Sequence, residues 1–418
     1  MITIMRAWTP ASRTPTGTCT SGWSTVIPII PTSIIVMSTD HAASNDRPAT
    51  RLATRLCFLA AGFAMACWAP LVPYAKARLG LDEASLGLLL LCLGIGSVTS
   101  MPLTGALVGR LGSRVVILAA GAGLCAALPG LALAGSMPVQ ALSLLLFGAS
   151  LGAIDVAMNV HAVAVEKDAG VPLMSGFHGL FSVGCVAGAG TMASLLALGL
   201  TPGAATGIAV LAVLAALGMA APRLLRHTSG GEASPLFVRP HGAVLLLGAL
   251  AFVAFLTEGA ILDWTALFLI ETRGFAPWAG GIGFALFSLA MTAGRLTGDR
   301  VVAALGGRRV LLWGGLLAVA GFVVLVAAPW AILSLLGLVL MGLGASNLVP
   351  VLFSAAGRQQ AMPVGLAVAA MTTIGYAGIL AGPALIGFAA AAVGLPASFV
   401  MLAGLVLCIP LASRRVAA

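Results

Sequence analysis

Acidic side chains are scarce in this chain, and some of them interrupt long apolar stretches. Asp155 and Asn159 stand four residues apart in one such stretch, and Glu258 stands in another. Residues four apart share one face of a helix, so Asp155 and Asn159 can act together. A carboxyl group in an apolar environment can bind a polar solute or carry a proton, or it can simply tie helices together. We predict Asp155, Asn159 and Glu258 as substrate or proton-coupling residues.

Other polar and aromatic side chains in the apolar stretches extend this candidate set. His178 is expected at a depth similar to that of Asp155, where the two form either a proton-sensitive pair or a static hydrogen bond. Asn347 can bind a polar solute through its donor and its acceptor, or it can join helices. The substrate or proton-coupling candidates are Asp155, Asn159, His178, Glu258, Asn347, the hydroxyl-bearing Tyr376, and Trp68, which could stack on a sugar ring.

A second group of charges lies near the ends of the apolar stretches. Arg295 and Asp299 are four residues apart and are predicted to form a gating charge pair. Asp263 is expected near the outer mouth, as a gate or an interfacial anchor. The gating candidates are Asp263, Arg295, Asp299, Arg110, Arg114 and Arg300. We expect a solvated loop cluster formed by His161, Glu166, Lys167 and Asp168.

About a dozen apolar stretches must position these side chains. A helix of about 20 apolar residues crosses a bilayer. Because lipid offers no hydrogen-bond partners, the backbone of each crossing must form its hydrogen bonds within a helix. The chain is 60% hydrophobic and 8% charged, whereas a soluble domain has roughly 25% charged residues. We predict an all-α integral membrane fold of twelve transmembrane helices, with spans near residues 56–75, 84–107, 115–134, 139–161, 174–198, 203–221, 243–269, 278–298, 310–328, 331–355, 364–389 and 395–412.

The basic residues predict the orientation of these spans. Most arginines, such as Arg110 and Arg308, fall on one set of alternate loops, and the opposite set holds Lys76, Arg78 and Arg273. The positive-inside rule makes the first side cytoplasmic and places both termini there. The net charge of +9 therefore reports topology, and it does not indicate a basic face for nucleic acid.

The longest polar connection, residues 222–241, divides the spans six and six. We predict a six-helix bundle over residues 51–221, a cytoplasmic linker over 222–241, and a second six-helix bundle over 242–418. Residues 1–50 are predicted to be a disordered extension or a segment that is not translated, with Met37 as the preferred true start. Prolines in the first 36 residues oppose a membrane helix, and no order of basic, apolar and small cleavage regions indicates a signal peptide.

The two sets of six spans repeat one another. Thr104-Gly105 followed by Leu111-Gly112-Ser113-Arg114 matches Thr297-Gly298 followed by Leu305-Gly306-Gly307-Arg308. Span four carries glycines and Asp155, and span ten carries glycines and Asn347 at the matching position. Repeated six-helix halves are typical of transporters whose substrate site lies between the halves near the bilayer midplane.

These residues resemble the major facilitator superfamily. The loop motif of that family is roughly Gly-x-Leu-x-Asp-Arg-x-Gly-Arg-Lys/Arg, and this chain has Gly105-Ala-Leu107-Val-Gly109-Arg110-Leu-Gly112-Ser113-Arg114. Gly109 replaces the usual aspartate, while the second copy keeps Asp299. The stretches 152–159, 175–182 and 257–264 are similar to those of a bacterial inner-membrane subgroup distantly related to fucose permeases. The resemblance implies that the chain has the superfamily's fold of two six-helix bundles and lies in the bacterial inner membrane.

We therefore predict a secondary active transporter that moves a small polar, sugar-like solute by proton symport and alternating access. No Walker lysine, metal-binding His-Glu-x-x-His or nucleophile–base set is recognisable, so we expect no ATP drive, metal, cofactor or enzymatic activity. The expected partners are the solute, protons and the lipid bilayer, with no nucleic acid, and the chain is predicted to be a monomer. The alternatives are a drug or metabolite exporter on the same fold and a non-transporting membrane sensor.

Overall fold

The computed structural model describes residues 48–81, 83–225, 239–276 and 279–416. Met37, nearly all of the predicted extension and much of the predicted linker lie outside the described residues. Within the described ranges every regular element is a helix.

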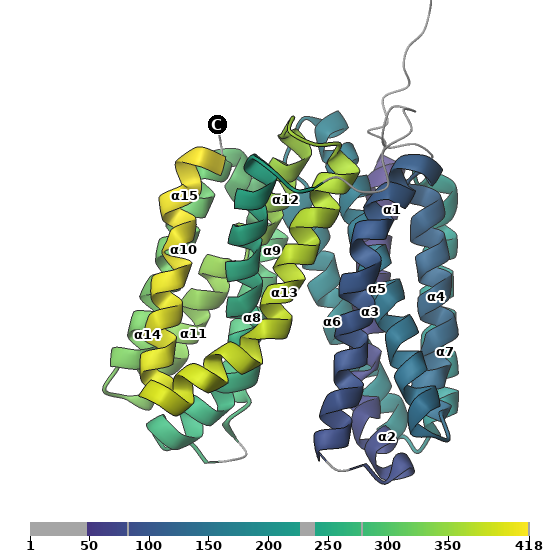
Figure 1. The fold of residues 1–418 in the computed structure, drawn as a ribbon, viewed down its shortest axis with the longest axis horizontal. Helices are drawn as coiled ribbons and strands as arrows, with labels where there is room; N and C mark the ends of the chain where they lie inside the picture. The colour runs from purple at the N-terminus through teal and green to yellow at the C-terminus, as the bar shows by residue number, and fades with distance from the viewer. Residues whose placement is uncertain (1–47, 82, 226–238, 277–278, 417–418) are drawn as a thin grey trace, which may run out of the picture. The chain divides into compact units, whose positions relative to one another are not determined.

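Helices α1 to α7 gather into one bundle and helices α8 to α15 into a second (Figure 1). The first bundle consists of α1 (Pro48–Cys67), the 3-10 helix η1 (Ala69–Leu71), α2 (Val72–Leu79), α3 (Glu83–Leu111), α4 (Ser113–Leu133), α5 (Met137–Ala169), α6 (Met174–Ala197), α7 (Pro202–Ala220) and the 3-10 helix η2 (Ala221–Arg223). The second bundle consists of α8 (Ala243–Arg273), α9 (Ile282–Leu305), α10 (Gly307–Ala327), α11 (Ala331–Ala345), α12 (Leu348–Arg358), α13 (Val364–Val393), α14 (Leu395–Val406) and α15 (Cys408–Val416).

Most of these helices are long and apolar enough to cross a membrane. Eleven spans meet that description within the described residues, and several of them combine two consecutive helices, such as α11 with α12. The remaining predicted span, residues 278–298, corresponds to α9 (Ile282–Leu305), whose apolar run is interrupted by Arg295, Asp299 and Arg300. The predicted fold is confirmed: within the described residues, these eleven spans and α9 form two bundles of six spans each.

The repeat that the sequence indicates is also visible in the backbone. Gly112 and Gly306 stand at the same place in the two bundles, between α3 and α4 and between α9 and α10, with φ of 81° and 78°. That region of φ is open to glycine and strained for other residues, so each glycine permits a tight turn. Gly184 of α6 and Gly378 of α13 also correspond, because each lets its helix approach the backbone of the neighbouring helix, α1 and α8 respectively.

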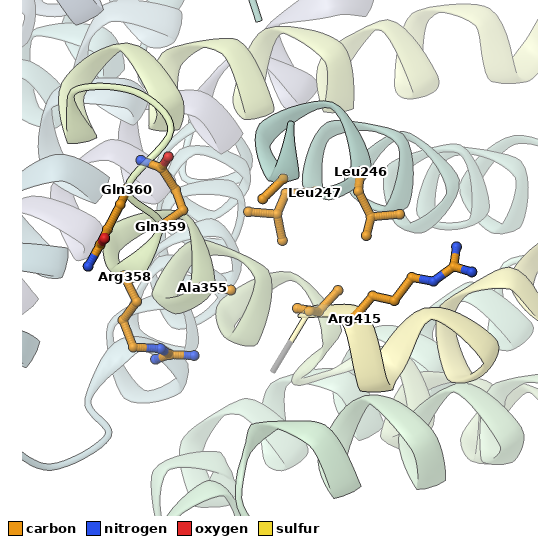
Figure 2. Close-up of a pocket in the computed structure, with 9 residues that line it drawn as sticks. Leu246, Leu247, Ala355, Arg358, Gln359, Gln360 and Arg415 are labelled. Carbon is orange, nitrogen blue, oxygen red and sulfur yellow. The ribbon is translucent and has the colours of Figure 1, made fainter. Parts of the chain in front are cut away.

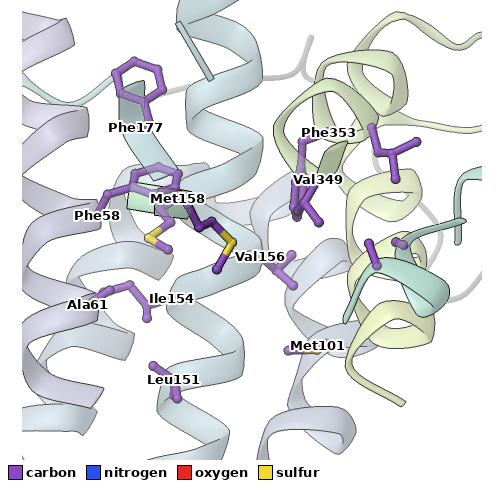
Figure 3. Close-up of a cluster of buried hydrophobic side chains, with 14 of the residues drawn as sticks. Phe58, Ala61, Met101, Leu151, Ile154, Val156, Met158, Phe177, Val349 and Phe353 are labelled. Carbon is purple, nitrogen blue, oxygen red and sulfur yellow. The ribbon is translucent and has the colours of Figure 1, made fainter. Parts of the chain in front are cut away.

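The two bundles are in close contact toward one end of the helices. We name it the arginine-rich end, because Arg110, Arg223, Arg308, Arg358 and Arg414 lie there. Toward this end, residues 154–163 of α5 and residues 365–369 of α13 are buried on every side. A cluster of buried apolar side chains there includes Phe58 and Phe177 from the first bundle and Val349 and Phe353 from the second (Figure 3).

Candidate functional site

A chain of hydrogen bonds joins three of the predicted residues within the first bundle. Helix α5 places Asp155 and Asn159 one turn apart, and Asn159 Nδ2 donates to the Asp155 carbonyl oxygen at 2.9 Å and to Asp155 Oδ1 at 3.3 Å. Asn159 Oδ1 lies 3.1 Å from Nε2 of His178 on α6. An amide oxygen can only accept, so His178 carries its proton on Nε2 in this amide orientation. Asp155 and His178 are therefore connected through Asn159.

Aromatic side chains from both bundles enclose the His178 ring. The ring centroid lies 5.3 Å from that of Phe58 on α1 and 5.3 Å from that of Phe353 on α12. Figure 3 shows Phe58 and Phe353 on opposite sides of the buried apolar cluster. Any movement of α12 away from the first bundle would remove one wall of the histidine's environment.

Arg295 is the centre of a second polar group, which lies mainly in the second bundle. Its Nη2 forms an ion pair with Glu258 Oε1 on α8 at 3.0 Å, and both side chains are largely buried, with 8% and 19% of their surface exposed. Its Nη1 donates to Ser182 Oγ at 3.1 Å, and its Nε donates to the Ser346 carbonyl oxygen at 3.3 Å. Because Ser182 is on α6, this guanidinium connects the two bundles.

The Ser346 carbonyl is free to accept this bond because of Pro350. A helical residue normally donates its N–H to the carbonyl four residues earlier, and proline has no N–H to donate. The helix is also interrupted at Asn347, which has φ of −109° and separates α11 from α12. Asn347 Nδ2 donates to the Gly294 carbonyl oxygen at 3.1 Å and to Ser346 Oγ at 2.9 Å. Its Oδ1 is buried and has no partner among the described residues.

Ser182 joins the two polar groups into one path through the protein. Its hydroxyl donates to the His178 carbonyl oxygen at 3.3 Å while it accepts from Arg295. The path therefore runs from Asp155 through Asn159, His178, Ser182 and Arg295 to Glu258. Five of these residues were predicted from the sequence and Ser182 was not. The available signal was its position four residues after His178, on the same helix face, in the stretch 175–182.

The structure places Arg295 and Asp299 in different contacts, although the sequence spacing suggested a pair. Asp299 Oδ1 accepts from the backbone N–H of Gly176 at 3.0 Å, across the two bundles. Glu166 Oε2 accepts from the N–H groups of Leu173 and Met174, both at 2.8 Å. The first N–H groups of a helix have no partner within the helix, and here carboxylates from α5 and α9 satisfy those of α6. Glu166 is therefore a helix cap, and its predicted place in a solvated loop cluster is wrong.

Replacing Asp299 with asparagine is expected to weaken the contact between the bundles at the arginine-rich end. A hydrogen bond to a charged group contributes about 1.5–3 kcal/mol, and the neutral amide would keep only part of it. A cysteine introduced at Ser354, which lines a cavity of about 300 Å³ between the bundles together with Gly170 and Gly307, reports this opening. Its labelling by a polar maleimide should rise roughly tenfold. The same reporter in a Glu271→Gln background, which changes an exposed acid on α8, is the control. Equal labelling in both would contradict the prediction.

Of the remaining predicted residues, Tyr376 lies within electrostatic range of both Asp155 and Glu258, the two ends of this path. Tyr376 of α13 makes an edge-to-face contact with Phe255, with centroids 5.6 Å apart. Trp68 is buried after the end of α1, and its Nε1 has no partner among the described residues. Asp263 is exposed on α8. Of the predicted gating arginines, Arg110 and Arg300 are exposed near the ends of α3 and α9, and Arg114 is half-buried at the start of α4.

His161 does not lie in a solvated cluster, contrary to the prediction. It is fully buried, its Nδ1 lies 3.3 Å from Thr54 Oγ1, and its Nε2 accepts from the Leu225 N–H at 3.0 Å. It therefore ties α1, α5 and the segment after α7 together. In the described part of the chain, no three His, Cys, Asp or Glu side chains are grouped as a metal-ligand set.

Comparisons with known proteins agree with this fold. The profile of the Major Facilitator Superfamily matches residues 55–359. An uncharacterized MFS-type transporter of Yersinia pestis is 52% identical over 366 residues, which cover 88% of this chain and 95% of that protein. Membrane protein MosC of Rhizobium meliloti is 34% identical over 344 residues, which cover 81% of this chain and 83% of that protein.

Solved structures show the same arrangement of helices. The E. coli transporter FucP in its outward conformation superposes with a TM-score of 0.73 at 16% identity, covering 90% of this chain and all of FucP. The human organic anion transporter MFSD10 gives a TM-score of 0.69 at 20% identity, covering 88% of this chain and all of that chain. The two bundles are those of a membrane transporter. The chain belongs to the major facilitator superfamily.

Proposed function

We propose that this chain is a proton-coupled symporter that moves a small polar solute across a bacterial inner membrane by alternating access. The arginine-rich end faces the cytoplasm, because loops rich in arginine and lysine remain on that side, and both termini lie there. The close contact of the bundles at this end corresponds to a state that is closed toward the cytoplasm. Rocking of the bundles about the polar path would then separate them at this end and bring them together at the other, which opens the site to the cytoplasm in turn.

The buried ion pair of Arg295 with Glu258 carries the proposal. Ionisable groups within membrane spans are costly and mark transport pathways. While Glu258 is ionised it holds the guanidinium, which also donates to Ser182 of the other bundle. A proton on Glu258 removes the charge that holds Arg295 and thereby loosens a contact between the bundles. Proton binding and bundle movement are coupled in this way, and Asp155 is a second candidate for the proton.

A neutral, hydroxyl-bearing solute is the substrate class that the polar path supports best. The Arg295–Glu258 pair is balanced in charge, and Asn159, Asn347 and Ser182 supply hydrogen-bond donors and acceptors. The structural neighbour FucP is named as a fucose:proton symporter, which makes sugars the first class to examine.

An organic anion is the second candidate class, and the same guanidinium favours it. When Glu258 carries a proton, an anionic solute can take its place beside Arg295, and the neighbour MFSD10 is named as an organic anion transporter. The two classes differ in the charge that moves. Symport of a neutral solute with a proton transfers net positive charge, whereas symport of a monoanion with one proton transfers none.

Reconstituted protein can test the function directly. Sugars including fucose, polyols and organic acids are first screened by thermal shift, because a ligand that binds the folded state stabilises it. A radiolabelled hit is then offered to proteoliposomes with an alkaline interior. We expect the solute to accumulate in response to the pH gradient. If accumulation also depends on the membrane potential, net charge moves with the solute, as expected for a neutral solute carried with a proton.

The variants Asp155→Asn and Glu258→Gln show which carboxyl group carries the proton. The responsible variant should lose accumulation and keep counterflow, since exchange of solute needs no net proton movement. Glu271→Gln, which changes an exposed acid on the same helix as Glu258, should behave as the unaltered protein. Full accumulation in both test variants, or uptake that ignores the gradient, would overturn the proposal.

A further inference from the structure

A cavity of about 460 Å³ lies at the arginine-rich end and within the second bundle. It is bounded by the start of α8, the end of α12 and the end of α15. Its lining residues are Ala243, Leu246, Leu247, Ala355, Arg358, Gln359, Gln360, Arg415 and Val416. Figure 2 shows Arg358 and the two glutamines on one side, Arg415 on the other, and Leu246 and Leu247 between them. None of these residues belongs to the path from Asp155 to Glu258.

The polar part of this lining suits an anion. Arg358 and Arg415 carry positive charge, and no carboxylate is among the lining residues that the structure describes. The Gln359 side chain is held in place, because its Nε2 donates to the Met362 carbonyl oxygen at 2.7 Å and its Oε1 accepts from the Met362 N–H at 2.9 Å. Guanidinium groups bind phosphate oxygens through two parallel hydrogen bonds, which makes arginine the preferred partner of phosphate groups.

The apolar part of the lining suits a molecule that also has a hydrocarbon portion. Leu246 and Leu247 of α8 form one wall, together with Ala355. The neighbouring Leu245 on α8 and Leu411 on α15 are exposed apolar side chains of membrane-spanning segments, with 49% and 74% of their surface accessible. The cavity therefore adjoins a surface that acyl chains can cover, and Arg358 and Arg415 lie at the ends of two membrane-spanning segments.

We infer that this cavity is a binding site for the phosphate-bearing head group of an anionic phospholipid of the adjacent leaflet. Basic cavities between transmembrane helices on the cytoplasmic side are suited to such head groups. The glycerol and the first carbons of the acyl chains lie against Leu246 and Leu247, and the anionic head group spans the cavity, with Arg358 at one side and Arg415 at the other. The inference does not depend on the identity of the transported solute.

Arg358 connects this cavity to the contact between the bundles, because it lines a cavity in each place. It lines the second cavity, of about 300 Å³, beside Glu166, Val302 and Val351. Glu166 is the residue that caps the start of α6. A head group that holds Arg358 within the first cavity withdraws its charge from the second, so lipid binding and closure of the bundles are linked.

Lipid binding to the full chain tests the inference. Detergent-purified protein is titrated with phosphatidylglycerol, with phosphatidylcholine and with inorganic phosphate, and the thermal midpoint and the lipid retained in native mass spectrometry are measured. We expect phosphatidylglycerol to raise the midpoint and to be retained, and phosphatidylcholine to do neither. Inorganic phosphate that stabilises the protein as much as phosphatidylglycerol would overturn the lipid assignment in favour of a soluble phosphate compound.

Charge-matched variants separate this cavity from general attraction to basic loops. The double variant Arg358→Gln with Arg415→Gln should weaken phosphatidylglycerol binding by tenfold or more. The control Arg308→Gln with Arg309→Gln removes the same charge from exposed positions at the same end and should keep the affinity within about twofold. Arg358→Lys with Arg415→Lys should retain part of the binding, and its thermal midpoint without lipid verifies folding. Equal losses in the glutamine double variant and the control, or no preference for phosphatidylglycerol, would refute the site.

Discussion

Replacing Arg295 with methionine is expected to lower the free energy of unfolding by about 3–5 kcal/mol, because the substitution leaves a buried carboxylate without its partner. Arg295 and Glu258 are 3.0 Å apart and both are largely buried. The substitution also removes the donors to Ser182 and to the Ser346 carbonyl oxygen. The unfolding free energy of the purified protein, measured by denaturant titration in mild detergent, is the appropriate quantity.

The double variant Arg295→Met with Glu258→Gln separates the two parts of this effect. Without either charge, no buried ion remains unpaired, so we expect the double variant to recover most of the stability that Arg295→Met loses. Ser182→Ala is the matched control, because it removes the hydroxyl that accepts from Arg295 and donates to the His178 carbonyl oxygen, and keeps the ion pair. It should cost about 1.5–3 kcal/mol, the contribution of a hydrogen bond to a charged group. If the single and double variants were equally stable, the ion pair would not be what holds this site.

The spans and their repetition could be predicted from the sequence, because hydropathy and spacing record them directly. The exact helix ends could not. The fourth span was predicted over residues 139–161, and the helix α5 continues to Ala169, where Gly170 ends it with a φ of 64°. The length of an apolar run indicates which part of a helix lies in the hydrocarbon core of the bilayer. The helix itself can continue beyond that core and ends at its capping residue. The polar residues after position 161 therefore read as a loop, although they continue a helix.

The sequence identified Arg295 and Asp299 as candidate functional residues, but it did not identify the groups that they contact. Arg295 and Asp299 are close on one helix, and sequence spacing reports only such neighbours. Their actual partners, Glu258 and the Gly176 N–H, come from other helices, and which helices meet depends on the whole fold. The proline at position 350 was a usable signal, because it predicts a free carbonyl at Ser346 and hence a place for a donor.

Lys76, Arg78 and Arg273 are the basic residues on the side that the positive-inside rule makes non-cytoplasmic. Two of them, Arg78 and Arg273, have a structural reason for their position. Arg78, near the end of α2, donates to the carbonyl oxygens of Ala132 at 2.5 Å, Leu131 at 3.1 Å and Ala134 at 2.8 Å. Arg273, at the end of α8, donates to the carbonyl oxygens of Leu325 and Val326 at 2.7 and 2.6 Å. The last carbonyls of α4 and α10 lack partners within their helices. The two arginines thus cap equivalent helices in the two bundles.

Arg273→Ala is therefore expected to reduce the unfolding free energy by about 1.5–3 kcal/mol, the contribution of hydrogen bonds from a charged group. Arg78→Ala should have a smaller effect. Arg78 is exposed while Arg273 is half-buried, so water can replace the Arg78 donors more readily.

Denaturant titrations of both single variants and of the double variant measure this difference. The two losses should add, because the sites lie in different bundles and share no contacts. Arg309→Ala, an exposed arginine at the opposite end of α10, is the control and should leave stability unchanged. A loss in Arg309→Ala that matches Arg273→Ala would attribute the effect to overall charge. A larger loss in Arg78→Ala than in Arg273→Ala would show that burial does not decide how strongly these caps stabilise their helices.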